Sequence, residues 1–296
     1  MGPTAAGKTA LAIALAQQHP FDIISVDSAM VYRGMDIGSA KPTPAELAIA
    51  PHRLIDIRDP SEPYSAAGFR QDAIKEIDDI LANQRTPLLV GGTMLYFRAL
   101  QQGLSPLPPA DPAIRQQLLQ EAQEKGWQAL HDELARVDPT SSKKIHPNDP
   151  QRLQRALEIY RATGKTRTQW YEEHTQKPLP YRFINVALIP NDRDLLRENI
   201  KKRVDHMLKN GLIDEVNALF QRPDLTPTLP ALRALGYRQT WQHLSGEYDL
   251  ATLKEKITTA TRQFAKRQLT WLRHWPDIVE MPAESVDVNQ VLGFLR

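Results

Sequence analysis

Short apolar stretches alternate with amphipathic ones over the first hundred residues. "FDIISVDS" (21–28) and "TPLLVGGT" (86–93) have the composition of buried strands, and "HRLIDI" (52–57) that of a shorter one. Between them, "SAAGFRQDAIKEIDDILAN" has the periodicity of a helix, with Ser65 as its N-cap. Strands that alternate with helices favour a parallel α/β sheet.

The pattern changes twice further along the chain. Prolines cluster in "LSPLPPADP", and helical, charged sequence follows. "RFINVALIP" (182–190) has again the composition of a strand, and the remainder is nearly all helical, with a last short strand in "DIVEM". The simplest interpretation is an α/β core at 1–105 and 180–296 with an inserted all-helical subdomain at 106–179.

The opening "MGPTAAGKT" contains the spacing G-x-x-x-x-G-K-T of a phosphate-binding loop. Its glycines let the loop curl so that N–H groups point at phosphate oxygens, and the following helix adds the positive end of its dipole. The alternative is an ordinary glycine-bearing turn before a helix. The predicted phosphate ligands are Gly2, Pro3, Thr4, Ala5, Ala6, Gly7, Lys8 and Thr9, and the Thr9 hydroxyl is also a candidate ligand for Mg²⁺.

A buried strand normally leads into such a loop, but only Met1 precedes Gly2. The expected fold is therefore a P-loop NTPase-like parallel sheet, flanked by helices, from which the first strand is missing. Either translation starts later than in relatives or upstream residues were lost. The second is favoured, because a sheet without this strand would have unpaired edges and an unfilled groove.

Composition narrows the classes of protein. Of 296 residues, 41% are hydrophobic, enough for a core, and the formal net charge is only +2, so nucleic-acid binding would depend on local basic patches. The absence of cysteine excludes disulfides, thiolate zinc sites and cysteine catalysis. No apolar run has membrane-spanning length and no signal peptide is recognisable, so a soluble, cytoplasmic protein without a membrane partner is expected.

Two polar residues follow the predicted strands where a ligand is expected. In open α/β sheets the ligand site lies beyond the carboxyl ends of the strands, and Asp27 and Thr93 stand there. Each also has an ordinary explanation, Asp27 as a turn residue and Thr93 as the N-cap of the next helix. No acidic residue directly follows "PLLV", which weakens the interpretation as an ATP-hydrolysing enzyme.

The late helix at 253–275 has two contrasting faces. At 100° per residue, Leu253, Ile257, Ala260, Trp271 and Trp275 fall near the direction of Phe264, while Arg262, Lys266 and Arg273 fall opposite. The basic face is either solvated or a contact for a polyanion. A second basic pair, Arg152 and Arg155, shares one helix face after a cap at Asn148 or Asp149.

Several segments, taken together, resemble the tRNA dimethylallyltransferases, also called tRNA isopentenyltransferases. They are "GPTAAGKT", "SVDSAMVYRGMDIGSAKPT", "PHRLIDI", "PYSAAGF", "LLVGGTMLYFRAL", "IHPNDPQRLQRALE", "LRALGYRQ" and "RQFAKRQLTWLR". They occur in order and extend from Gly2 to Arg273. The resemblance implies transfer of a dimethylallyl group from dimethylallyl diphosphate to N6 of the adenosine at tRNA position 37, with release of diphosphate, by a Mg²⁺-dependent monomer.

The resemblance also implies roles for individual residues. The catalytic residues would be Lys8 and Thr93, which act on the leaving diphosphate, and Asp27, which takes the N6 proton. The acceptor base would be flipped out of the anticodon stem-loop. The implied tRNA contacts are Asp27, Ser28, Ala29, Met30, Thr93, Arg115, Gln151, Arg152, Leu153, Gln154, Arg155, Arg233, Ala234, Leu235, Gly236, Tyr237, Arg238, Lys266, Arg267, Gln268, Leu269, Thr270, Trp271, Leu272 and Arg273.

Two other functions fit part of the sequence. A P-loop kinase of small molecules or nucleosides would share the phosphate loop and an acidic residue after the second strand, but has little use for the basic helix and the large insertion. An RNA-binding module with a decayed nucleotide site is disfavoured, because Lys8, Thr9, Asp27 and Thr93 are all present.

Overall fold

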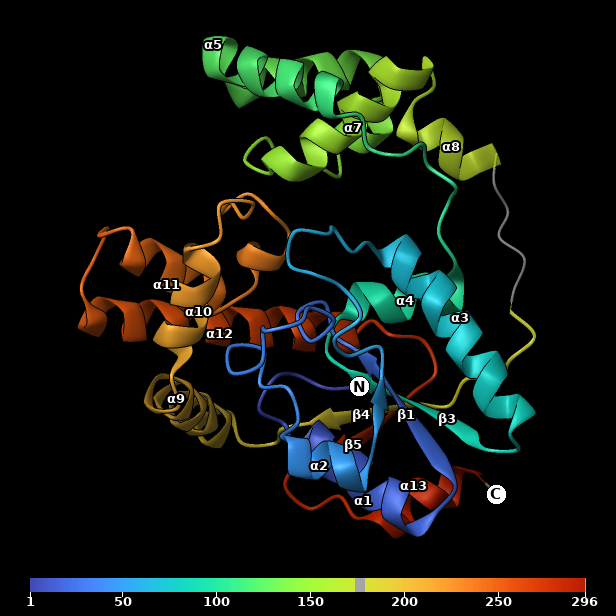
Figure 1. Cartoon of the computed structure of the whole chain (residues 1–296). Helices are drawn as coiled ribbons and strands as arrows, with labels where there is room; N and C mark the ends of the chain where they lie inside the picture. The colour runs from blue at the N-terminus through green and yellow to red at the C-terminus, as the bar shows by residue number, and fades with distance from the viewer. Residues whose placement is uncertain (174–178, 296) are drawn as a thin grey trace. The chain divides into compact units, whose positions relative to one another are not determined.

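The protein is described by a computed structural model that places residues 1–173 and 179–295. Residues 174–178, which belong to the expected insertion, lie outside the described residues, as does Arg296. The chain divides into two compact units, Met1–Gln101 with Pro180–Arg296, and Gln102–Leu179 (Figure 1). Each unit is described by itself.

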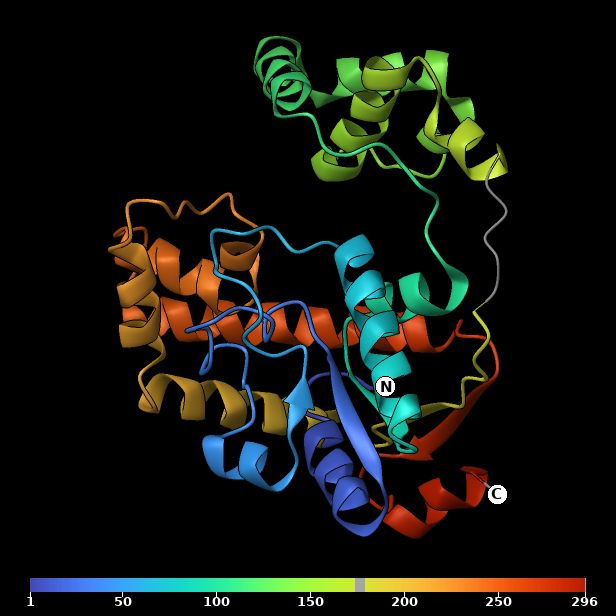
Figure 2. The same cartoon turned by 45° about the vertical axis from the view of Figure 1, so that its right-hand side comes forward.

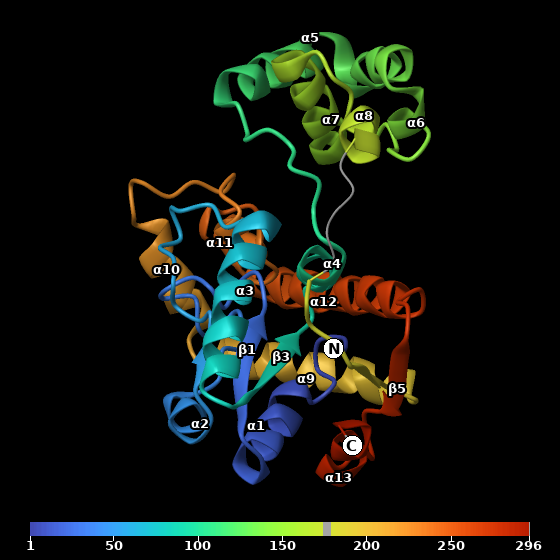
Figure 3. The same cartoon turned by 90° about the vertical axis from the view of Figure 1, so that its right-hand side faces the viewer.

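The first unit contains a small parallel sheet covered by helices on both faces. β1 (Phe21–Val26) lies between β2 (His52–Arg53) and β3 (Thr86–Gly91). α1 (Lys8–Gln18) packs against apolar side chains of β1 and β3, and α3 (Ala66–Ala82) lies across the sheet from it (Figure 3). The predicted strands at 21–28 and 86–93 are confirmed, whereas the one at 52–57 is reduced to two residues.

A second parallel sheet pairs β4 (Asn185–Ile189) with β5 (Ile278–Pro282). On the other edge of β4 the backbone of Met1 makes two strand-like hydrogen bonds. Its amine donates to Val186 O at 2.7 Å, and its carbonyl accepts from Leu188 N at 2.9 Å. The two sheets are thus separate, and β3 and β4 each present an edge without a full partner strand among the described residues.

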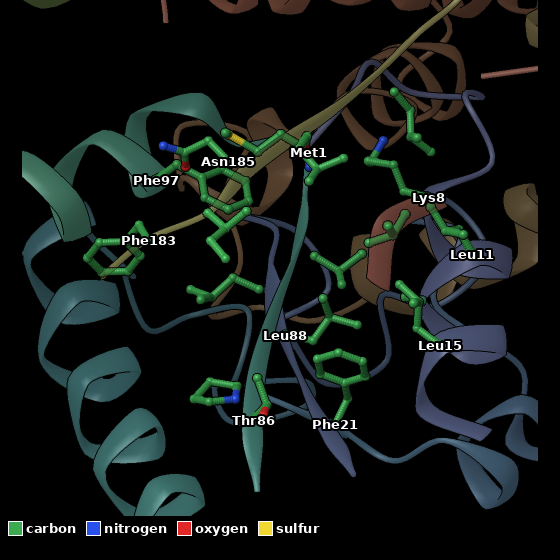
Figure 4. Close-up of a pocket in the computed structure, with 18 of the residues that line it drawn as sticks. Met1, Lys8, Leu11, Leu15, Phe21, Thr86, Leu88, Phe97, Phe183 and Asn185 are labelled. Atoms are coloured by element: carbon green, nitrogen blue, oxygen red, sulfur yellow. The ribbon is translucent and has the colours of Figure 1, made fainter. Parts of the chain in front are cut away.

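An apolar cavity of about 210 Å³ lies between these two edges. Figure 4 shows Leu11 and Leu15 of α1 on one side, Leu88 of β3 in the middle, and Met1 and Phe183 along the other side. This cavity separates the two sheets.

Helices complete the first unit. Four of them pack on one another beside the sheets (Figure 2): α9 (Arg193–Lys209), α10 (Leu212–Phe220), α11 (Tyr237–Leu244) and α12 (Leu250–Leu272). Helix α3 begins at Ser65, whose hydroxyl accepts from Gly68 N–H at 3.1 Å, as predicted. The bounds of the remaining elements are α2 (Pro44–Ile49), α4 (Met94–Gln102), η1 (Ala231–Arg233), α13 (Val288–Leu292) and η2 (Gly293–Leu295).

The regular secondary structure of the second unit is all helical within its described residues. It contains α5 (Pro112–Val137), α6 (Pro139–Ser142), α7 (Pro150–Thr163) and α8 (Arg167–Glu173). Asp149 caps α7 by accepting from Arg152 N–H. The core of this unit is formed by Leu118, Ala122, Leu130, Leu134, Ile145, Leu153, Ala156 and Leu157.

The chain is therefore a mixed α/β protein with a small parallel sheet flanked by helices. None of the helices described here is both long enough and apolar enough to cross a membrane.

Candidate active site

The loop at residues 2–7 leads directly into the first helix. Helix α1 begins at Lys8, and its N-cap, Gly7, has a left-handed backbone with φ 76°. Ala5 also has positive φ, at 64°, which an L-residue adopts at some cost, so the loop is tightly curled. The Lys8 ammonium donates to Pro3 O at 2.6 Å across this curl. Loop N–H groups and a cationic side chain therefore gather at the positive end of a helix.

Three charged side chains influence one another beside this loop. The pKa of Lys8 is lowered from 10.5 to about 8, mainly because burial disfavours its charge, and also because the Arg203 guanidinium lies near. Burial likewise lowers the pKa of Arg203, while the Asp27 carboxylate acts in the opposite direction on both cations. Lys8 and Arg203 are thus two desolvated cations with one nearby carboxylate, that of Asp27, to balance their charge. The excess positive charge favours binding of an anion.

The turns that follow β1 and β3 meet beside these charges. Val26 and Gly91 are opposite in the parallel register, so the residues after them leave the sheet at the same edge. The Thr93 hydroxyl accepts from Ser28 N–H at 3.2 Å, rather than from an amide of its own helix. The Asp27 carboxylate accepts from the N–H groups of Ala29 (2.8 Å) and Met30 (3.2 Å).

The Gly-Gly turn after β3 is needed for close approach. A Cβ on Gly91 would meet Val26 O at 2.1 Å, and one on Gly92 would meet the Gln268 carboxamide nitrogen at 2.3 Å. The sequence "LLVGGT" therefore lets the turn that bears Thr93 lie directly against β1 and α12.

The inward face of α12 agrees only in part with the one predicted: Leu253, Ile257 and Trp275 are buried as expected, whereas Ala260, Phe264 and Trp271 are half-buried. Its buried residues are Leu253, Ile257, Thr258, Thr261, Ala265, Gln268 and Leu272, so the face is rotated away from Phe264 and Trp271, which are half-buried. Arg262 is half-buried as well and does not belong to the exposed basic face. The reason is that polar side chains can face inward when the backbone satisfies them. Thr258, Thr261 and Gln268 donate to Lys254 O, Ile257 O and Gly92 O respectively.

The half-buried carboxylate of Glu215 holds the loop at residues 36–38. Glu215 of α10 accepts from the N–H groups of Asp36, Ile37 and Gly38 at 2.7–3.0 Å. Tyr237, fully buried, donates to the same carboxylate at 2.6 Å. The Tyr237 side chain thus supports this loop from within.

The residues predicted to contact tRNA fall into three groups by exposure. The exposed group contains Ser28, Gln151, Arg152, Arg233, Arg238, Lys266, Arg267, Thr270 and Arg273. The half-buried group contains Asp27, Ala29, Met30, Thr93, Arg115, Gln154, Arg155, Ala234, Leu235, Leu269 and Trp271. The buried group contains Leu153, Gly236, Tyr237, Gln268 and Leu272. In the second unit, Arg115 and Arg155 both pair with the buried Glu158, at 3.0 and 2.8 Å. The buried members have packing roles inside the protein, and the tRNA contacts stay predictions.

The protein ligands for a Mg²⁺ ion would be few. Within the described residues no cluster of three or more His, Asp or Glu side chains could hold a metal. The half-buried Thr9 hydroxyl stands in the first turn of α1, beside the loop. This donor set fits an ion that is held chiefly by phosphate oxygens and water, as Mg²⁺ often is.

Sequence reasoning missed Arg203 and Glu215. Buried residues of α9 recur at Leu196, Ile200, Val204 and Met207, and Arg203 stands between Ile200 and Val204, directly beside this face. Its guanidinium donates to Ser39 O at 3.2 Å. A charged residue beside the apolar face of a helix is the signal that could have identified it. Glu215 gave no comparable signal.

Comparisons with known proteins identify the family. The family model "IPP transferase" matches residues 30–275. The solved tRNA isopentenylpyrophosphate transferase of Bacillus halodurans is 37% identical, with 99% of this chain and 93% of that chain covered and a TM-score of 0.72. The tRNA delta(2)-isopentenylpyrophosphate transferase of Staphylococcus epidermidis is 34% identical, with coverages of 100% and 95% and a TM-score of 0.70.

A third structure extends the similarity to eukaryotes. A eukaryotic dimethylallyltransferase acting on tRNA is 28% identical, with 98% of this chain and 73% of that chain covered and a TM-score of 0.78. These matches are to prenyl-transferring enzymes, so the kinase alternative is set aside. The chain belongs to the IPP transferase family.

Proposed function

We propose that this protein transfers a dimethylallyl group from dimethylallyl diphosphate to N6 of the adenosine at tRNA position 37 and releases diphosphate. Family membership supports the reaction. The observation that carries it to this chain is the convergence of Lys8, Arg203, Asp27 and Thr93 beyond the carboxyl ends of β1 and β3. At one site, Lys8 and Arg203 provide positive charge for a diphosphate, and Asp27 provides a carboxylate for an amine.

The chemistry requires a stabilised leaving group. When the allylic C–O bond breaks, positive charge develops on carbon and negative charge on diphosphate. Lys8, Arg203 and N–H groups of a P-loop-like segment at 2–9, other than that of Thr4, which donates to Gln268, stabilise the departing anion, and the Thr93 hydroxyl donates to its bridging oxygen. The N6 lone pair forms the new C–N bond, and Asp27 accepts the proton that N6 loses.

Magnesium fits this scheme as a counter-ion of diphosphate. Bound by the Thr9 hydroxyl and by diphosphate oxygens, Mg²⁺ would supply further charge neutralisation for the leaving group. Removal of Mg²⁺ with a chelator is therefore expected to slow transfer.

The tRNA partner is proposed to bind through its anticodon stem-loop. The exposed basic residues of α12, the "LRALGYRQ" segment and the helical unit, with Arg115 and 151–155, are the surfaces proposed to contact it. The resemblance to the family further supports a monomer that acts in the cytoplasm.

One assay decides between this function and nucleotide-dependent alternatives. Unmodified tRNA is incubated with the protein and either dimethylallyl diphosphate or ATP, and the nucleosides are analysed by mass spectrometry. We expect an adenosine that carries a dimethylallyl group with the first donor and no phosphorylated product with the second. An unmodified adenosine in both reactions would contradict the proposal.

The affinity for dimethylallyl diphosphate should fall as the pH rises above about 8. The pKa of Lys8 is about 8 without a bound anion, and a bound diphosphate will raise it, so binding takes up a proton wherever free Lys8 is neutral. The dissociation constant should therefore rise by about tenfold per pH unit above 8. Titration calorimetry from pH 7 to 10, in chelator and without tRNA, measures this slope.

Lys8→Arg provides the matched control for this pH dependence. A guanidinium stays protonated across the whole range, so the variant should bind with an affinity that depends little on pH. An equally steep loss of affinity in Lys8→Arg would assign the titration to another group.

The exposed basic face of α12 should carry much of the salt dependence of tRNA binding. Lys266 and Arg267 are exposed on this helix, and Arg273 is exposed at its C-cap. Changing all three to Gln should weaken tRNA binding and flatten the slope of log K against log salt by roughly 0.7 for each phosphate that the protein no longer neutralises. Filter binding at several salt concentrations gives the slope.

A second triple variant tests whether net charge alone explains the result. Lys201, Lys202 and Lys209 are exposed on α9, and their change to Gln removes the same formal charge. We expect it to leave the slope nearly unchanged. Equal flattening by both variants would mean that the face of α12 is simply solvated.

A further inference from the structure

Gln268 connects three segments that are far apart in the sequence. Its carboxamide oxygen accepts from Thr4 N–H in the phosphate loop at 2.8 Å, and its carboxamide nitrogen donates to Gly92 O in the turn after β3 at 2.8 Å. The side chain is 3% exposed. Because both ends of the amide are used by backbone groups, the distance between the loop and the turn is fixed by one side chain on α12.

The packing around this amide strengthens the connection. Ala5 of the loop and Leu269 of α12 both pack against an apolar cluster formed by Leu196, Ile200 and Ala265. A Cβ on Gly92 would overlap the carboxamide nitrogen at 2.3 Å, so the turn approaches Gln268 as closely as a glycine permits. A shift of α12 would therefore move Thr4 and Gly92, and with Gly92 the adjacent Thr93.

The same helix presents a different surface to solvent. Lys266, Arg267 and Thr270 are exposed within two residues of Gln268. One turn of α12 thus has exposed cations on its outer side and Gln268 on its inner side. Among the described residues, Gln268 has the only side chain that forms hydrogen bonds with both the loop and the turn after β3. A polyanion bound to the outer face and a diphosphate bound at the loop would both act on the position of this turn of helix.

We propose that Gln268 is a positioning residue that couples tRNA binding on α12 to the binding of dimethylallyl diphosphate at the loop. The proposal rests on the function proposed above. Docking of tRNA fixes this turn of α12, and Gln268 then holds Thr4 and Gly92 at the separation that the diphosphate requires. Each substrate should therefore raise the affinity for the other by the same factor.

The first test measures that factor directly. The ligands are dimethylallyl diphosphate and an anticodon stem-loop with guanosine in place of the acceptor adenosine, so that no transfer occurs. We expect the stem-loop to tighten diphosphate binding by about fivefold or more in the wild type, within the usual range for coupled sites. In Gln268→Met the factor should fall to about one, while binding of the stem-loop alone changes by less than about twofold.

Gln263→Met is the matched control, because Gln263 is exposed on the same helix. It should keep the coupling factor of the wild type. With reactive tRNA, Gln268→Met should raise KM for dimethylallyl diphosphate more than it lowers kcat at saturation. An unchanged coupling factor in Gln268→Met, or a wild type with no coupling, overturns the proposal. A wild type that transfers no dimethylallyl group to tRNA overturns the proposed function instead.

A second pair of variants keeps the proposal testable if Gln268→Met does not fold. Gly92→Ala pushes the carboxamide away from the turn and should also abolish coupling. Gln268→Ala removes the obstructing amide, so adding Gly92→Ala to it should cause little further loss of coupling, and the two changes should be strongly non-additive. Additive effects would mean that the two residues act separately, and would overturn the proposal.

Discussion

Asp27→Ala should lower the single-turnover rate of dimethylallyl transfer by about 10²- to 10⁴-fold, the usual cost of losing a general base. The carboxylate follows β1 and lies near Lys8 and Arg203, where the acceptor nitrogen would arrive opposite the leaving diphosphate. The affinity for dimethylallyl diphosphate should stay close to that of the wild type. Rapid-quench kinetics with saturating enzyme and labelled tRNA measure the transfer step.

Asp27→Asn separates proton transfer from the structural role of this residue. The wild-type carboxylate accepts from the N–H groups of Ala29 and Met30, and an asparagine oxygen can keep both hydrogen bonds. We expect Asp27→Asn to melt at the wild-type temperature and yet to transfer as slowly as Asp27→Ala. If Asp27→Asn transfers at a near wild-type rate, Asp27 only shapes the turn, and water or a phosphate oxygen becomes the proton acceptor.

An extended apolar segment joined ahead of Met1 should stabilise the protein markedly. The edges of β3 and β4 face a cavity of about 210 Å³, and Met1 already pairs with β4 in a parallel register that preceding residues would continue. Five Val- and Ile-rich residues would fill the space and bond to both edges. After the ordering cost, we expect a net gain on the order of 2 kcal/mol, or roughly 5 °C in melting temperature by calorimetry.

A Gly/Ser segment of equal length is the control, because it extends the chain without filling the cavity. It should raise the melting temperature by much less than the apolar segment. Equal melting temperatures for the apolar, Gly/Ser and unextended proteins would show that the cavity contributes little to instability.

The stabilisation should also depend on pH. Burial, with a smaller contribution from Lys8, lowers the pKa of the Met1 amine from 8.0 to about 5. The unfolded chain binds a proton at this amine below pH 8, whereas the folded chain does so only below about 5. The folded state of the unextended protein therefore loses stability as the pH falls from 8 to 5. An extended chain has no amine in this place. The difference in melting temperature between the apolar-extended protein and the unextended protein should therefore widen as the pH falls from 8 to 5.

The sequence determined much of the fold and the composition of the site. Apolar runs at 21–26, 86–91 and 185–189 became strands, because buried parallel strands need continuous apolar sequence. The phosphate-loop spacing predicted a helix starting near Lys8, and α1 begins there. The positions of Asp27 and Thr93 after strands predicted that they would lie at one edge of a sheet. These are local signals, which depend on neighbours in the chain.

Only the tertiary structure decided the contacts between distant segments. The family resemblance implied that Gln268 contacts tRNA, yet its side chain faces inward, because Thr4 N–H and Gly92 O satisfy its amide. Arg203 and Glu215 became site residues through segments more than 160 positions away, Ser39 and the loop at 36–38. A polar side chain is buried only where its partners happen to meet, and periodicity along one helix carries no information about partners on another element.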